Sequence, residues 1–127
     1  MKKMNIGAIR GAITVDENTP DAIINTTSCL LQEIIKKNQL QISDIISIYF
    51  TATDDLDAAY PAIAARQLGI TQAALMCFQE MKVIGSLGKC IRVVVQICTP
   101  DSQAMMHHIY LKEAASLRPD LAINKKE

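Results

Sequence analysis

Two arginines lie among apolar residues in segments whose patterns are typical of β-strands. Arg92 stands in the β-branched run Cys90–Cys98, and Arg10 stands in the alternating segment Asn5–Val15. An arginine shielded from water requires an anion, and its planar guanidinium fits a carboxylate or a phosphate. The alternative is structural, because the stem can pack while the charged end reaches water or a subunit boundary. Two such arginines on separate strands favour a small ligand with two negative charges.

Three further side chains could complete such a site. Glu80 follows a short apolar run that ends at Phe78, with only Gln79 between them, and Cys77 and Tyr110 lie in equally apolar surroundings. Each has a structural alternative: Glu80 can neutralise an arginine, Tyr110 can belong to an interface, and Cys77 can be an inert buried thiol. The residues alone leave both interpretations open.

Several common reaction types have no motif in this sequence. The chain contains no nucleophile–His–Asp arrangement, phosphate-binding loop, GxGxxG or HExxH. His107 and His108 are adjacent, so they cannot share a helix face as metal ligands, and the four cysteines show no metal-ligand spacing. The sequence therefore predicts chemistry that uses no metal and no covalent nucleophile.

The composition is that of one ordinary domain. The chain has 127 residues, half of them hydrophobic, and its 13 basic and 13 acidic side chains cancel. No long-range field would recruit nucleic acid or an anionic membrane, so neither is an expected partner. The basic N-terminus is not followed by a continuous apolar segment, and no segment approaches transmembrane length. We therefore expect a single cytoplasmic domain over residues 1–127.

The spacing of apolar residues predicts an α+β or α/β fold with four or five strands. Thr19, Pro20 and Asp21 form a strong helix start, and an apolar stripe continues that helix to about Asn38. A short helix is expected from Tyr60 to a stop at Gly69. The strands are expected at residues 5–15, 45–53, 73–78 and 90–98.

The last part of the chain fits two descriptions. Residues 102–117 have helical propensity, but a helix followed by a short strand fits as well. Pro119 is expected to end whichever element precedes it, and residues 119–127 are expected to form a mobile tail.

Six short motifs, in order along the chain, resemble the small monofunctional chorismate mutases. The resemblance is to the class that assembles as a trimeric pseudo-α/β barrel and not to the all-helical class, and it extends from about residue 5 to 122. The motifs are Ile9-Arg10-Gly11-Ala12, Asp55-Leu56 with Tyr60-Pro61-Ala62 and Ala65-Arg66, Gln79-Glu80, Cys90-Ile91-Arg92-Val93, His108-Ile109-Tyr110-Leu111 and Leu117-Arg118-Pro119-Asp120-Leu121.

This resemblance implies an α+β fold, with a mixed β-sheet that carries helices on one face and assembles into a homotrimer. It also implies the cofactor-free conversion of chorismate to prephenate, on the route to phenylalanine and tyrosine, at sites between subunits. Because that rearrangement is pericyclic, the protein would hold the substrate in a compact conformer and stabilise the charge that builds as the ether bond breaks.

The resemblance also assigns roles. Arg92 would lie against the ether oxygen and a carboxylate, Arg10 and Tyr110 would hold the enolpyruvyl carboxylate, and Glu80 with Cys77 would bind the ring hydroxyl. The remaining substrate-binding positions would be Tyr60, Ala62, Arg66 and Met76, together with Leu117 and Arg118 from a tail that closes on binding.

The sequence departs from the family at three positions. Position 60 is often phenylalanine, Ile63 stands where some members carry a charge, and Met76 stands where some carry threonine. Two other functions remain as alternatives: a non-catalytic trimer that binds a small carboxylate, and a trimeric enzyme of the imine or enamine deaminase kind.

Overall fold

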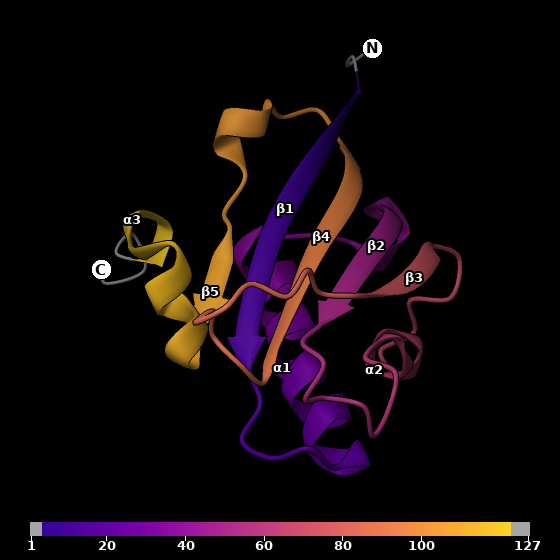
Figure 1. The fold of residues 1–127 in the computed structure, drawn as a ribbon. Helices are drawn as coiled ribbons and strands as arrows, with labels where there is room; N and C mark the ends of the chain where they lie inside the picture. The colour runs from indigo at the N-terminus through magenta and orange to yellow at the C-terminus, as the bar shows by residue number, and fades with distance from the viewer. Residues whose placement is uncertain (1–3, 123–127) are drawn as a thin grey trace.

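The computed structural model describes residues 4–122, which form a five-stranded mixed sheet with the strand order β3-β2-β4-β1-β5 (Figure 1). Strand β4 is antiparallel to both of its neighbours, whereas β5 is parallel to β1 and β3 is parallel to β2. This architecture confirms the predicted α+β class. The strands are β1 (Asn5–Thr14), β2 (Ile45–Ala52), β3 (Ala74–Gln79), β4 (Cys90–Thr99) and β5 (Ile109–Leu111), and the helices are α1 (Pro20–Lys37), α2 (Ala62–Gln67) and α3 (Pro119–Ala122).

Helix α1 covers one face of the sheet, which we call the core face (Figure 1). Its start is capped as expected, because the Thr19 hydroxyl accepts the backbone N–H of Ala22 at 3.2 Å and Pro20 occupies the first turn. Helix and sheet approach closely at Gly11, where an added Cβ would lie 2.9 Å from Cδ1 of Ile34. The absence of a side chain at Gly11 therefore lets α1 lie flat on β1.

The opposite face, which we call the open face, carries the polar half of each alternating strand. On β4, Ile91 and Val93 are buried on the core face, whereas Arg92 is exposed on the open face. Strand β1 alternates in the same way, with Ile9 buried on the core face and Arg10 half-buried on the open face. The predicted division of both strands into an apolar and a mixed face is confirmed.

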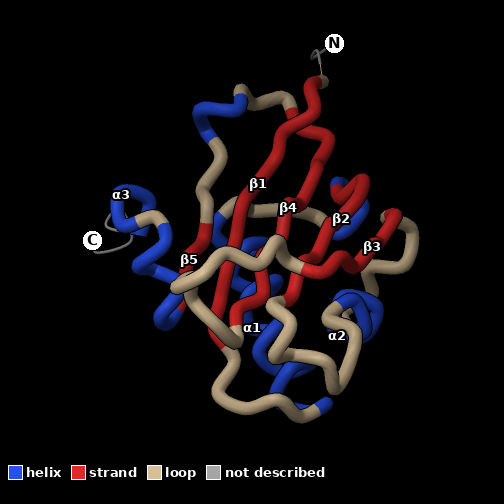
Figure 2. The backbone as a smooth tube through the Cα atoms, viewed as in Figure 1, coloured by secondary structure: helices blue, strands red, loops and turns tan. Residues whose placement is uncertain are grey.

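The segment between β3 and β4, residues 81–89, crosses the open face, and we call it the crossing loop. Figure 2 shows it as a tan segment that runs from β3 across β4 and β1 toward β5. Leu87 of this loop packs against a small buried cluster that contains Ala12, Cys90 and Tyr110. The loop therefore forms one wall above the strand that carries Arg92.

The C-terminal part differs from a plain helix. Residues 103–105 and 112–117 are 3₁₀ turns on either side of the short strand β5. Of the two descriptions expected for residues 102–117, the one with a helical turn followed by a short strand is closer to the structure. Pro119 follows the end of the second 3₁₀ turn and also begins helix α3. Helices α1 and α2 both pack on the core face, as expected for helices on one face of the sheet. The 3₁₀ turn of residues 112–117 instead packs on the open face through Ala114. Residues 123–127 of the expected mobile tail lie outside the described residues.

The longest described helix is not apolar enough to cross a membrane.

Candidate active site

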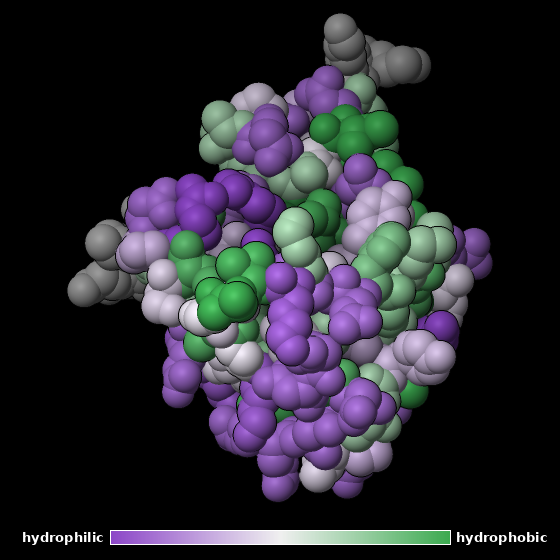
Figure 3. Space-filling view, viewed as in Figure 1, coloured by the Kyte–Doolittle hydropathy of each residue, from purple (hydrophilic) through white to green (hydrophobic). Residues whose placement is uncertain are grey.

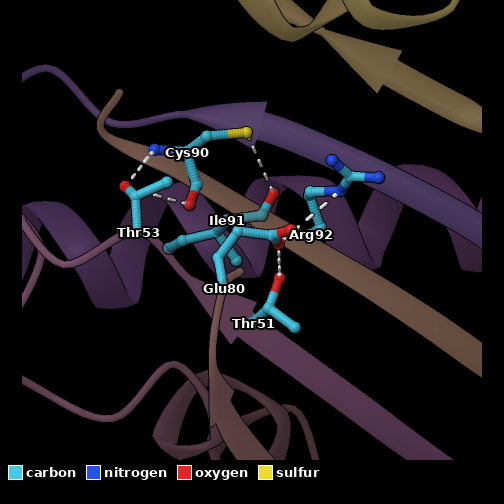
Figure 4. Close-up of polar contacts among 6 residues, drawn as sticks. All are labelled: Thr51, Thr53, Glu80, Cys90, Ile91 and Arg92. Atoms are coloured by element: carbon cyan, nitrogen blue, oxygen red, sulfur yellow. Dashed lines mark hydrogen bonds and ion pairs between the residues drawn. The ribbon is translucent and has the colours of Figure 1, made fainter. Parts of the chain in front are cut away.

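The side chains of Thr51, Glu80 and Arg92 meet on the open face, where the crossing loop leaves β3 (Figure 4). Oε1 of Glu80 lies 3.7 Å from Nε of Arg92, and the same oxygen accepts a hydrogen bond from the Thr51 hydroxyl. Glu80 follows the last residue of β3, and its backbone N–H donates to the Ala52 carbonyl at 3.0 Å, which extends the pairing with β2. Strand pairing therefore fixes the carboxylate beside the guanidinium.

The register of the strands places the other predicted residues near this pair. Ala12 lies opposite Arg92 on one side and opposite Tyr110 on the other. With about 4.8 Å between neighbouring strands, Arg92 and Tyr110 are roughly 10 Å apart across the small side chain of Ala12. Arg10 lies two residues before Ala12 on the same face. Arg10, Arg92 and Tyr110, which are distant in the sequence, thus share one side of the sheet.

The two arginines retain unused donors. Among residues 4–122, the guanidinium of Arg10 has no hydrogen bond or ion pair, and Arg92 contacts an acid only through Nε to Glu80. The Arg92 side chain is 49% exposed, whereas that of Glu80 is 21% exposed. The planar outer nitrogens of both arginines remain available to a ligand with two carboxylates.

A pocket of about 200 Å³ opens beside the ion pair. Glu80 and Arg92 line it from the sheet, Leu87 lines it from the crossing loop, and Leu117 lines it from the 3₁₀ turn after β5. Cys90 also lines it, and burial raises the pKa of this thiol to about 11 against the opposing effect of Arg92. Cys90 is therefore a neutral apolar wall at physiological pH.

A second group of predicted residues lies elsewhere on the chain. Cys77 points toward the core side of β3, opposite Phe50 of β2, and lines a larger pocket of about 740 Å³ together with Tyr60. Tyr60 is 71% exposed in front of α2, Arg66 is exposed on α2, and Ala62 is buried at 4% exposure. Met76 lies on the open face and is 55% exposed. These residues do not reach the Glu80–Arg92 pocket of the same chain.

Residues 117–122 pack on the open face near Tyr110. Arg118 donates to both carboxylate oxygens of Asp120, at 3.1 and 2.8 Å. These hydrogen bonds raise the pKa of Arg118, and the nearby Tyr110 contributes in the same direction. Arg118 thus stands close to a predicted site residue but is paired with a local acid.

Sequence reasoning missed two threonines that support the site. Thr51 orients Glu80, and the Thr53 hydroxyl accepts the backbone N–H of Cys90 at 3.0 Å. Alternation along β2 places Thr51 on the open face, which is a usable signal. Its contact with Glu80 depends on β2 pairing with both β3 and β4, which the sequence does not specify.

Comparison with known proteins identifies the family. Residues 6–121 match the sequence profile of the family described as chorismate mutase type I. The chain belongs to this family. It is 42% identical to the chorismate mutase AroH of Bacillus subtilis, over 96% of this chain and 97% of that protein. It is 44% identical to the AroH of Thermus thermophilus, over 91% and 96% of the two chains.

A solved structure supports the same assignment. The chorismate mutase from Clostridium thermocellum is 53% identical and superposes with a TM-score of 0.84, over 86% of this chain and 97% of that chain. The resemblance inferred from the motifs is therefore confirmed. The protein is a chorismate mutase, an intramolecular transferase of aromatic amino acid biosynthesis.

Proposed function

We propose that chorismate is converted to prephenate in the pocket beside Glu80 and Arg92, with Arg10 and Tyr110 as further contacts. The observation that carries this assignment is the pair of partly unsatisfied guanidinium groups on the open face, one of them 3.7 Å from a carboxylate. Chorismate carries two carboxylates, an ether oxygen and a ring hydroxyl. Two cations and one hydrogen-bond acceptor match these groups.

The proposed mechanism needs only positioning and fixed charge. The rearrangement breaks the ether C–O bond and forms a C–C bond within one molecule, so no atom or proton is exchanged with the protein. Arg10 and Tyr110 hold one carboxylate and thereby keep the side chain folded over the ring. Arg92 donates to the ether oxygen, where negative charge builds in the transition state.

Glu80 has a different part, because it accepts rather than donates. Its carboxylate would accept the ring hydroxyl of the substrate, while Thr51 keeps it from turning fully onto Arg92. Cys77 was expected beside this hydroxyl, and it lies on the other face of β3 of the same chain. We therefore expect Cys77 to approach the ligand through its backbone or from another subunit.

We further propose that the site is completed by a neighbouring copy in a homotrimer. Tyr49, Met76 and Phe78 are 41%, 55% and 48% exposed on the open face, and Figure 3 shows hydrophobic residues gathered over β2 and β3. An exposed apolar area of this kind is typical of a subunit interface. Contact there would bring the Tyr60 and Arg66 region of one copy to the Glu80–Arg92 pocket of the next.

We also propose a cellular location for the enzyme and a role for residues 117 and 118 in closing the site. As an enzyme of aromatic amino acid biosynthesis, the protein is expected to act in the cytoplasm. Leu117 already lines the small pocket, so Leu117 and Arg118 would close over bound substrate. Closure requires Arg118 to exchange its contact with Asp120 for a carboxylate of the ligand.

The test follows the loss of chorismate's ultraviolet absorbance at several concentrations. We expect saturable turnover by the unmodified protein and a loss of about 10²–10³ in kcat for Arg92→Ala, equivalent to roughly 3–4 kcal/mol. Lys36→Ala is the matched control, since it removes an exposed cation from α1. Replacement of Arg92 by lysine or citrulline should also be severely impaired.

Three results would contradict the proposal. Unchanged turnover in a folded Arg92→Ala variant would remove Arg92 from the chemistry. If calorimetry detected chorismate binding but no conversion followed, the protein would be a carboxylate-binding protein without this activity. If light scattering showed a monomer at the assay concentration, the proposal of a site shared between subunits would be wrong.

A further inference from the structure

The crossing loop connects the two charged residues of the site directly. Glu80 precedes it, and Arg92 follows its end by only three residues. Most of its side chains, including Met81 and Ile84, are strongly exposed. Its position over the open face must therefore be held by its ends rather than by a core of its own.

The end of the crossing loop is bound by the carboxylate of Asp55. The backbone N–H of Lys89 donates to both oxygens of Asp55, at 3.1 and 2.9 Å, and the Thr53 hydroxyl donates to one of them at 2.5 Å. The approach is so close that a Cβ added to Gly88 would lie 2.8 Å from Oδ2 of Asp55. A side chain at position 88 would therefore push the Asp55 carboxylate out of its present position.

Lys89 is held from both sides in an unfavourable conformation. Its φ is 46°, a left-handed value that costs a residue with a side chain roughly 1–2 kcal/mol. Its N–H is bound by Asp55, and its carbonyl accepts the backbone N–H of Val15 at 2.7 Å. Such a conformation persists only where the surroundings enforce it.

The next residue is tied to the same group. Thr53 donates its backbone N–H to the Cys90 carbonyl at 3.1 Å. Figure 4 shows that its hydroxyl also accepts the Cys90 N–H, at 3.0 Å. Asp55 therefore orients the Thr53 hydroxyl that accepts the backbone N–H of Cys90, the first residue of β4. The chain of contacts runs from Asp55 through Thr53 to Cys90, two residues before Arg92.

We propose that Asp55 is a positioning residue of the reaction, which fixes the junction between the crossing loop and β4 and so sets where Arg92 stands relative to Glu80. The proposal rests on the site proposed above. Asp55 does not line the pocket beside the ion pair, so it acts through Thr53 and Lys89 and not by touching the substrate. Its ionised form suits this role: burial raises its pKa, but the hydrogen bonds from Thr53 and Lys89 outweigh that effect and lower it.

The alternative is that Asp55 only stabilises the fold, and a matched variant separates the two. Asp44 is also a carboxylate that accepts a backbone N–H, from Gln41 at 2.9 Å, but it is half-buried and precedes β2. It lies about 30 Å along the chain direction from Thr53, since an extended residue spans roughly 3.3 Å. Asp44→Ala removes the same kind of contact far from the pocket.

The experiment compares kcat and KM of Asp55→Ala, Asp55→Asn and Asp44→Ala with the unmodified protein, well below the unfolding temperature of each. We expect Asp55→Ala to lower kcat by about tenfold to a hundredfold, with a smaller rise in KM, because small misplacement of a catalytic group has effects of that size. Asparagine keeps one acceptor oxygen for Lys89, so Asp55→Asn should retain an intermediate kcat. Asp44→Ala should stay within about twofold.

Amide hydrogen exchange gives a readout that does not depend on turnover. We expect faster exchange at Lys89 and Cys90 in Asp55→Ala and not in Asp44→Ala. A folded Asp55→Ala variant with unchanged kcat, or with unchanged exchange at these amides, would overturn the proposal. If Asp55→Ala does not fold, an unchanged kcat in Asp55→Asn would do so. An inactive unmodified protein would instead refute the proposed site, while the exchange measurement would still test the position of the loop.

Discussion

The hydrogen bond from Thr51 to Glu80 offers a sharp test of how the active site is organised. Thr51 lies directly opposite Arg92 in the β2–β4 pairing, and its hydroxyl donates to the oxygen of Glu80 that faces the guanidinium. Replacing Thr51 with valine keeps a β-branched side chain on the strand and removes only the donor. The strand should therefore survive while the carboxylate loses its restraint.

The size of the effect follows from the geometry. A hydrogen bond to a charged group contributes about 1.5–3 kcal/mol, and water replaces part of it where the carboxylate is 21% exposed. If roughly 1.4 kcal/mol is lost in the transition state, kcat/KM falls about tenfold. A freed Glu80 would also turn toward the outer nitrogens of Arg92 and compete with the substrate carboxylate, so we expect KM to rise along with the fall in kcat.

The assay is initial-rate loss of chorismate absorbance across a range of concentrations for Thr51→Val and Thr51→Ser. Serine keeps the hydroxyl, so Thr51→Ser should stay within about threefold of the unmodified protein. Equal unfolding midpoints would show that both variants retain the fold. A Thr51→Val variant with unchanged kcat/KM would refute the idea that Thr51 keeps Glu80 and Arg92 apart.

Three further outcomes follow from the structure. Gly11→Ala should lower the urea midpoint of unfolding by the equivalent of about 1–3 kcal/mol, because the new methyl group would meet a side chain of α1 and a carbonyl of β5; an unchanged midpoint would contradict this. Iodoacetamide at mildly alkaline pH should label exposed Cys29 well before Cys90, whose pKa of about 11 and 2% exposure both oppose reaction, and unfolding should abolish the difference. The free energy of unfolding of the unmodified protein should exceed that of Asp55→Asn by its full amount above pH 3.8, the ordinary pKa of that carboxyl, and the difference should shrink as the pH falls through the lowered pKa of the folded state. The reason is that a depressed pKa stabilises the folded state only while the group is ionised. A difference that is constant with pH would exclude this linkage.

The sheet that carries the site was predictable because apolar and polar residues alternate along much of its strands. The charge of Arg92 interrupts an otherwise apolar period, and a period of two residues places it on the face opposite Ile91 and Val93. Helix α1 was predictable for a similar reason, since its cap and its buried stripe are local features of the sequence. Local patterns were sufficient wherever one face of an element is buried.

The C-terminal segment was less predictable because non-local contacts decide its conformation. The side chain of Gln103 bonds both the N–H and the carbonyl of Ala8, at 2.8 and 2.6 Å, like a neighbouring strand. The Nδ1 atom of His108 accepts the N–H of Arg10 at 2.9 Å. Both contacts join positions more than ninety residues apart. The segment between Gln103 and His108 has helical propensity, but its contacts with β1 outweigh that propensity, and a single sequence does not specify those contacts.

The separation of the predicted site residues has a physical consequence for catalysis. The side chain of Arg92 is 49% exposed, so water screens its charge. Its interaction with negative charge in the transition state is therefore weaker than in a site without water, because the interaction energy falls as the local dielectric constant rises. Leu87 and Leu117 cover the pocket from two sides, but Tyr60 and Arg66 of the same chain do not reach it. On the proposed arrangement, a neighbouring subunit supplies both the missing contacts and the exclusion of water. We therefore expect a protomer prevented from associating to retain the ion pair and lose most of its turnover.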